Sequence, residues 1–86
     1  MNQNTTGDQN VAVGSLAGDA ITTGAQNTAI GYASLTSATT ASNNTAIGRA
    51  TLNENSSGTN NTAVGHDALE SNTTASSNTA VGAQAL

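Results

Sequence analysis

The chain repeats itself every 17 residues, and this period limits its possible folds more than any other feature. The pentapeptide Asn-Thr-Ala-Ile/Val-Gly occurs four times, and the variant Asn-Val-Ala-Val-Gly occurs once before them. These segments begin at Asn10, Asn27, Asn44, Asn61 and Asn78. A fixed period of this length is typical of repeat architectures, in which each unit packs on its neighbours to form one continuous core.

Other residue types recur with the same phase. The Gly column consists of Gly14, Gly31, Gly48, Gly65 and Gly82. Four residues after each of the last four glycines is a leucine, which gives the column Leu35, Leu52, Leu69 and Leu86. A column of small residues consists of Gly7, Gly24, Ala41, Gly58 and Ala75. Several columns that keep one spacing along the chain indicate stacked coils of equal length.

The pattern within one repeat predicts β structure. Side chains alternate between the two faces of a strand, so Thr28 and Ile30 share one face and Ala29 takes the other. The segment Tyr32–Leu35 alternates in the same way and predicts a second short strand. No apolar stripe with the 3.6-residue spacing of a helix is present. We therefore expect an all-β parallel solenoid, or β-roll, of five 17-residue coils that form one domain over 1–86.

The composition indicates that one such chain is only marginally stable by itself. Leu, Ile and Val together make up 12 of 86 residues, and Phe, Trp, Cys and Pro are absent. Composition alone would predict disorder, and only the periodicity argues against it. We expect a second copy of the chain to supply the missing burial, packed on the flat column of small apolar residues in the strands. These residues are Ala12, Ala29, Ala46, Ala63 and Ala80.

Two further expectations concern individual positions. The Asn that opens each repeat should form a ladder in which each amide bonds the amide of the neighbouring coil. The first coil differs from the others, because it has Gly18 where Leu is expected and Ile21 where Asn or Ala is usual. Leu16 has the same side parity as the Leu column, so it could still fill the core of that coil, and the departure marks either a terminal coil or a contact with another chain.

The segments Asn27–Leu35 and Asn61–Leu69 resemble the head repeats of trimeric autotransporter adhesins and related phage tail-fibre proteins. The family's Ser-Val-Ala-Ile-Gly-like strand is matched best by Asn10–Gly14. The resemblance covers nearly the whole chain and implies a side-by-side homotrimer of β-rolls in an attachment structure. It implies an extracellular location, on a virion or a cell surface. The period of 17 and the Thr in place of the first Val depart from the usual family pattern.

The two chain ends have matching phase. Met1 and Leu86 both fall in the Leu column, so 2–86 contains five whole periods. One interpretation is a subunit that stacks end to end into a self-polymerising filament through its open strand edges. A second is an excerpt of a longer repetitive protein, and a third is coincidence.

The residue after each Gly is the most variable, and it collects Tyr32, Arg49 and His66 in one column. Stacking would let Tyr32 and Arg49 form a cation–π pair with His66 next to them. This column is either a small binding surface for a receptor or glycan, or a solvent-exposed position that varies freely. The Thr column raises an ice-binding alternative, although we expect the column to be partly buried because it shares a face with Ile and Val. The Thr residues are Thr28, Thr45, Thr62 and Thr79.

Other functions are disfavoured by the residues present. One basic residue against five acids cannot neutralise a row of phosphates, which argues against nucleic acid as a partner. No apolar run is long enough to span a membrane, and the residues given do not have the pattern of a signal peptide. His66-Asp67 is the only His next to an acid, and it lacks the further ligands or bases that metal binding or catalysis requires. We expect no enzymatic activity, no metal and no cofactor.

Overall fold

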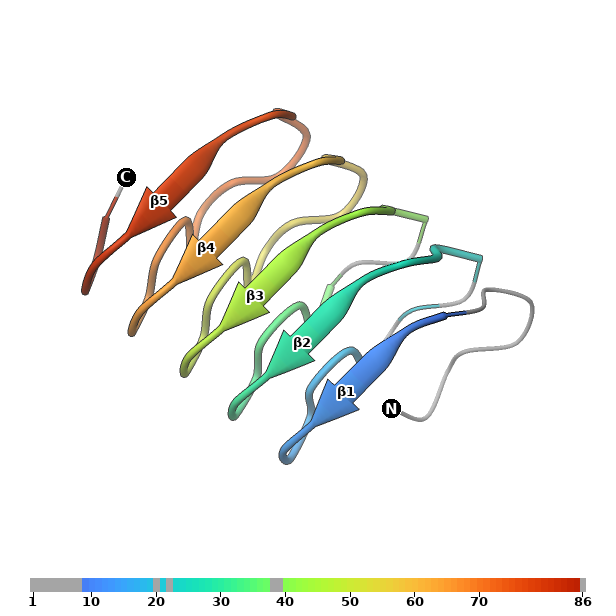
Figure 1. Cartoon of the computed structure of the whole chain (residues 1–86), viewed down its shortest axis with the longest axis horizontal. Coiled ribbons are helices and arrows are strands. Elements are labelled where there is room, and N and C mark those ends of the chain that lie inside the picture. Colours follow the sequence, from blue (N-terminus) through green and yellow to red (C-terminus); the bar gives the residue numbers. More distant parts are fainter. Residues whose placement is uncertain (1–8, 20, 22, 38–39, 86) are drawn as a thin grey trace.

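The computed structural model describes residues 9–19, 21, 23–37 and 40–85. Five short strands form one parallel sheet in the order of the sequence (Figure 1). The strands are β1 (Val11–Val13), β2 (Thr28–Ile30), β3 (Thr45–Ile47), β4 (Thr62–Val64) and β5 (Thr79–Val81). Each residue of a strand pairs with the residue 17 positions later, as in Ala29 with Ala46. The chain is therefore a parallel β-solenoid, as the period predicts, and the structure shows about four turns where five coils were expected.

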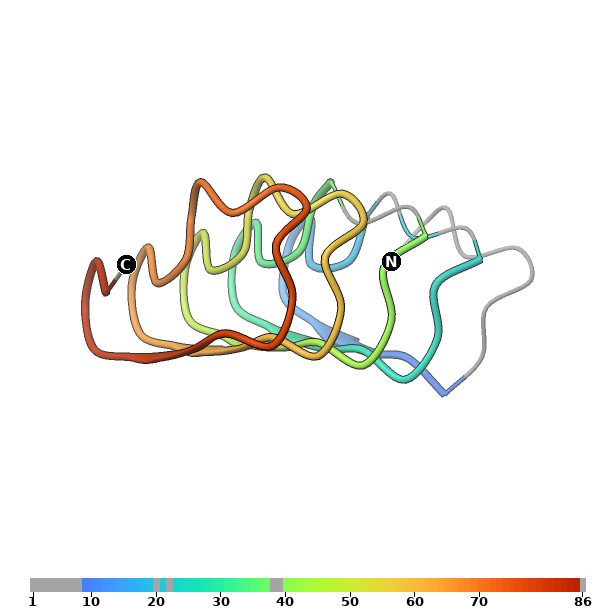
Figure 2. The ribbon, with the colours of Figure 1, turned by 90° about the horizontal axis from the view of Figure 1, so that it is seen from above.

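Each coil has two layers (Figure 2). The strand layer consists of the five strands, and the turn layer is formed by the segments that return from one strand to the next. The turn layer was predicted to contain a second strand over Tyr32–Leu35, and this prediction is wrong. Ala33 and Leu35 have φ values of 61° and 51°, so alternate residues adopt the left-handed conformation and the segment is a run of turns. Such a path advances less per residue than a strand, and it closes the coil.

The turn layer still carries hydrogen bonds between coils. The Ala33 N–H donates to Ser15 O of the preceding coil at 3.0 Å, and the Leu35 N–H donates to Thr51 O of the following coil at 3.0 Å. Alternate peptides therefore point toward opposite neighbours. The backbone of this layer is satisfied by the adjacent coils without extended geometry.

The interior contains the Ala column of the strands and the Leu column of the turn layer. Ala29, Ala46 and Ala63 are fully buried, as are Leu35 and Leu52. The prediction that the Ala column faces outward to a neighbouring chain is therefore wrong. Leucines that reach inward from the turn layer fill the centre of each coil, so only small side chains fit beneath the strands.

In the first coil, the side chain that fills the core is not Leu16. Leu16 is exposed, whereas Ile21 is fully buried. A Cβ built on Gly18, which occupies the Leu column, would lie 3.1 Å from Ile21 Cδ1. The Ile21 side chain therefore fills the space that Leu35 and Leu52 fill in later coils. Leu16 takes no part in the core of the first coil.

The Asn ladder is present as predicted. Asn44 Nδ2 donates to Asn27 Oδ1 at 3.2 Å and to Gly58 O at 2.9 Å, while Asn44 Oδ1 accepts from the Asn61 N–H at 3.0 Å. Asn27, Asn44 and Asn61 are almost completely buried. These side chains tie three coils together at the corner before each strand. Met1, Gly7 and Leu86, which belong to the predicted columns, lie outside the described residues.

Candidate functional site

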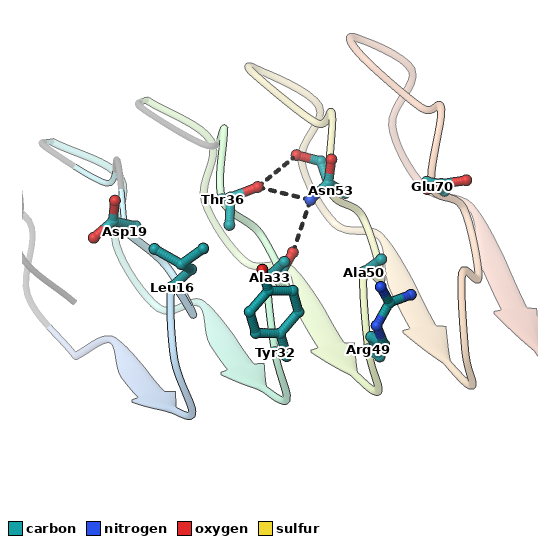
Figure 3. Close-up of a pocket in the computed structure, with 9 residues that line it drawn as sticks. All are labelled: Leu16, Asp19, Tyr32, Ala33, Thr36, Arg49, Ala50, Asn53 and Glu70. Carbon is teal, nitrogen blue, oxygen red and sulfur yellow. Dashed lines mark hydrogen bonds between the residues drawn. The ribbon is translucent and has the colours of Figure 1, made fainter.

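A groove of about 440 Å³ runs along the turn layer, parallel to the axis of the stack (Figure 3). Its residues come from three columns with the 17-residue spacing. Tyr32 and Arg49 form one rim, and Ala33 and Ala50 form the floor between the rims. None of the lining residues belongs to a strand.

The first rim is a chain of side-chain contacts across three coils. The Arg49 guanidinium lies over the Tyr32 ring, with 5.7 Å between Cζ and the ring centroid. On its other side, Arg49 Nη1 lies 3.1 Å from His66 Nε2. The predicted cation–π contact is therefore present, and His66 is the next member of the column. Tyr32 is half exposed, and it borders the groove.

The chemistry of Arg49 determines the tautomer of His66. A guanidinium group only donates hydrogen bonds, so His66 Nε2 must be the acceptor. The ring proton then lies on Nδ1, which is 3.4 Å from Asp67 Oδ2. Asp67 Oδ1 is buried and has no hydrogen-bond partner among the described residues. His66 is thus held between an acid and the guanidinium group, and it positions Arg49 over Tyr32.

The second rim is a column that the sequence analysis did not identify. It contains Asp19, Thr36, Asn53 and Glu70. Asn53 Nδ2 donates to Thr36 Oγ1 at 2.9 Å and to Ala33 O at 3.0 Å, which fixes the middle of the rim. Asp19 and Glu70 lie at opposite ends of the groove (Figure 3). The 17-residue spacing of these residues could have identified the column in the sequence. It was overlooked because the four residues are of four different types.

The groove is suited to binding and shows no arrangement for metal chemistry. Within the described part of the chain, no three His, Asp or Glu side chains lie close enough together to hold a metal ion. The groove instead combines an aromatic face, a guanidinium donor, a hydroxyl, an amide and two terminal carboxylates. In the same described part, no helix is long and apolar enough to cross a membrane.

The outer face of the strand layer is a second candidate surface. Because the Ala column is inside, the alternate residues point outward: Val13 is 57% exposed, Ile30 and Ile47 are each 37% exposed, and Val81 is 70% exposed. Thr28, Thr45 and Thr62 stand beside them in register. Thr28, Thr45 and Thr62 are themselves partly buried, as expected, whereas Thr79 is exposed. Sequence alternation alone does not reveal which face lies inside.

Comparisons with known proteins do not place the chain in a family. No protein-family model matches the sequence, and neither the curated proteins nor the solved structures include a significant match. The two surfaces described above therefore remain as the features that bear on function.

Proposed function

We propose that the chain is a structural, self-associating segment of an extracellular fibre or adhesin head, and that its copies pack through the outer face of the strand layer. The observation that carries this proposal is the exposure of Val13, Ile30, Ile47 and Val81 on one continuous sheet face. A parallel sheet is normally covered on both faces, and contiguous apolar patches on a protein surface mark interaction sites.

The charge distribution supports a second copy of this chain as the occupant of that face. The chain has a net charge of −4, so identical copies repel one another in general. The two outward columns of the strands contain only Val, Ile and Thr, and therefore no charge faces another copy there. A flat row of β-branched side chains packs well against another such row. Three copies, as the resemblance to adhesin heads implies, would bury these faces around a common axis.

The test is sedimentation velocity of the full chain over a wide concentration range. We expect one species of three chains that does not dissociate on dilution. Replacing Ile30 and Ile47 together by Lys should yield monomers, because each buried ammonium group would cost several kcal/mol. The matched control carries the same added charge as Thr40→Lys with Thr74→Lys, on exposed residues outside the strands, and should remain trimeric.

Two outcomes would contradict the proposal. Species that grow without limit as the concentration rises would favour the end-to-end filament instead. A wild-type chain that stays a folded monomer at all concentrations would show that the outer face of the strand layer does not mediate self-association.

The second of these outcomes leads to the other candidate function, an ice-binding surface. The observation that favours it is the regular row of Thr28, Thr45, Thr62 and Thr79 on the same flat face, one per coil. A monomer that produced thermal hysteresis, and lost it on replacement of Thr45 by Lys, would support this function. A trimer without thermal hysteresis would exclude it, because the same face cannot serve both purposes.

A further inference from the structure

The groove presents Arg49, the only Lys or Arg side chain of the sequence, and no described carboxylate is bound to it. In the described part of the chain, Arg49 contacts only the Tyr32 ring and His66 Nε2, and neither contact neutralises its charge. The guanidinium group is exposed and is held in place from both sides. A fixed guanidinium fork matches the geometry of a carboxylate and binds it through two parallel hydrogen bonds.

The surroundings of Arg49 define the rest of the ligand. The half-exposed Tyr32 side chain is an aromatic surface next to the guanidinium group, and Ala33 and Ala50 are small side chains that leave room in the groove. Asp19 and Glu70 at the two ends only accept hydrogen bonds when ionised, so they favour hydroxyl groups and disfavour negative charge there. A ligand that fits has its carboxylate in the middle, a ring with an apolar face beside it, and hydroxyl groups at its ends.

We propose that this groove binds an oligosaccharide that carries a sugar-ring carboxylate, with Arg49 binding the carboxylate and Tyr32 packing against the sugar ring. Hexuronic acids and sialic acids share this chemistry. The groove is complete within one chain and lies outside the strand layer, so the inference does not depend on self-association.

Tyr32 provides a specific signal for the test, because it is the only aromatic residue apart from His66 and the only fluorescent one. The full chain is titrated with trigalacturonic acid and, separately, with 3′-sialyllactose, and tyrosine emission is recorded. The neutral counterparts are the methyl ester of trigalacturonic acid and lactose. We expect a saturable change with at least one acidic sugar and none with its neutral counterpart, and the two acidic sugars distinguish a uronic from a sialic acid source.

Arg49→Gln should weaken binding of the acidic sugar by about tenfold or more, which is the usual loss for a charge-assisted hydrogen-bonded pair. Arg49→Lys retains the charge but not the planar fork of the guanidinium group. Its affinity for the acidic sugar should therefore lie between that of the wild type and that of Arg49→Gln. Thr74→Glu has the same net charge as Arg49→Gln, changes an exposed residue outside the groove, and should bind like the wild type.

The proposal is overturned if neither acidic sugar produces a saturable change, if neutral sugars bind equally well, or if Arg49→Gln binds like the wild type. Circular dichroism and sedimentation of the variants separate loss of binding from loss of fold or of self-association. Arg49 is exposed and lies outside the strand face, so its replacement should change neither.

Discussion

The buried asparagines show how single residues of this chain hold separate coils together. Each Asn side chain at the corner before a strand bonds the coil before it, the coil after it, or both, and these bonds are made in a nearly dry interior. A buried amide of this kind costs free energy unless its donors and its acceptor are satisfied. In this ladder the neighbouring coils provide the partners, so the polar column is compatible with the core.

Asn44→Ala should therefore destabilise the chain by about 3 kcal/mol, because the Asn61 N–H, Gly58 O and Asn27 Oδ1 each lose a bonding partner. Asn78→Ala is the matched control at the end of the ladder. The Asn78 side chain donates one bond, to Asn61 Oδ1, so the loss should be about 1 kcal/mol. Urea denaturation followed by circular dichroism measures both values. Equal losses would show that the ladder bonds do not carry the stability.

At the scale of the element, each coil has two places from which its centre can be filled. Coils two to four use a Leu from the turn layer, whereas the first coil uses Ile21 and has Gly18 in the Leu column. The alternatives exclude one another, because a Cβ on Gly18 already approaches Ile21 Cδ1 to 3.1 Å. The exchange also explains why Leu16 is left exposed, since the coil has no space left for it.

This exclusion predicts strong coupling between the two positions. Gly18→Leu alone should destabilise the chain by about 2 kcal/mol through overpacking. Ile21→Asn alone should lower the free energy of unfolding by about 3 kcal/mol, because it leaves a cavity where the Ile21 side chain lay. The double variant recreates the Leu52 and Asn55 pair of the third coil. Its free energy of unfolding should therefore lie within about 1 kcal/mol of that of the wild type. A double-mutant cycle by chemical denaturation checks this, and simple additivity of the two losses would show that the side chains do not compete.

At the scale of the whole molecule, each of the five described strands contacts only the strands immediately before and after it. Each strand pairs with the strands immediately before and after it, and the ladder bonds also span one period. Stability in such an array is close to a sum of unit and interface contributions. The number of coils should therefore be adjustable as long as the period is kept.

Deletion of residues 44–60 removes one whole period and joins Asn43 to Asn61 in phase. We expect the shortened chain to keep its β-type circular dichroism, with a urea m-value lower by about one fifth, because less surface is exposed on unfolding. Deletion of 44–52 removes only part of a period and should abolish the fold, because every column after the junction loses its register. If both deletions behave alike, the columns do not determine the stacking.

Much of this architecture follows from the sequence alone. The 17-residue interval determines the parallel register, because only stacked coils of equal length bring Asn27 next to Asn44 and Ala29 next to Ala46. The same interval placed Tyr32, Arg49 and His66 in one column, since residues one period apart must be neighbours. The opposite rim of the groove was missed, because its residues share a spacing but no chemical type.

The tertiary structure alone decided which side of each strand is inside. Alternation shows that Thr28 and Ile30 share a face, but it does not show whether that face is covered. The space left by Leu35 and Leu52 decides this, because leucines that reach across from the turn layer leave room only for Ala beneath the strands. The Thr, Ile and Val side chains are consequently outside, and the surface that we propose for self-association is the one opposite to that expected from the sequence.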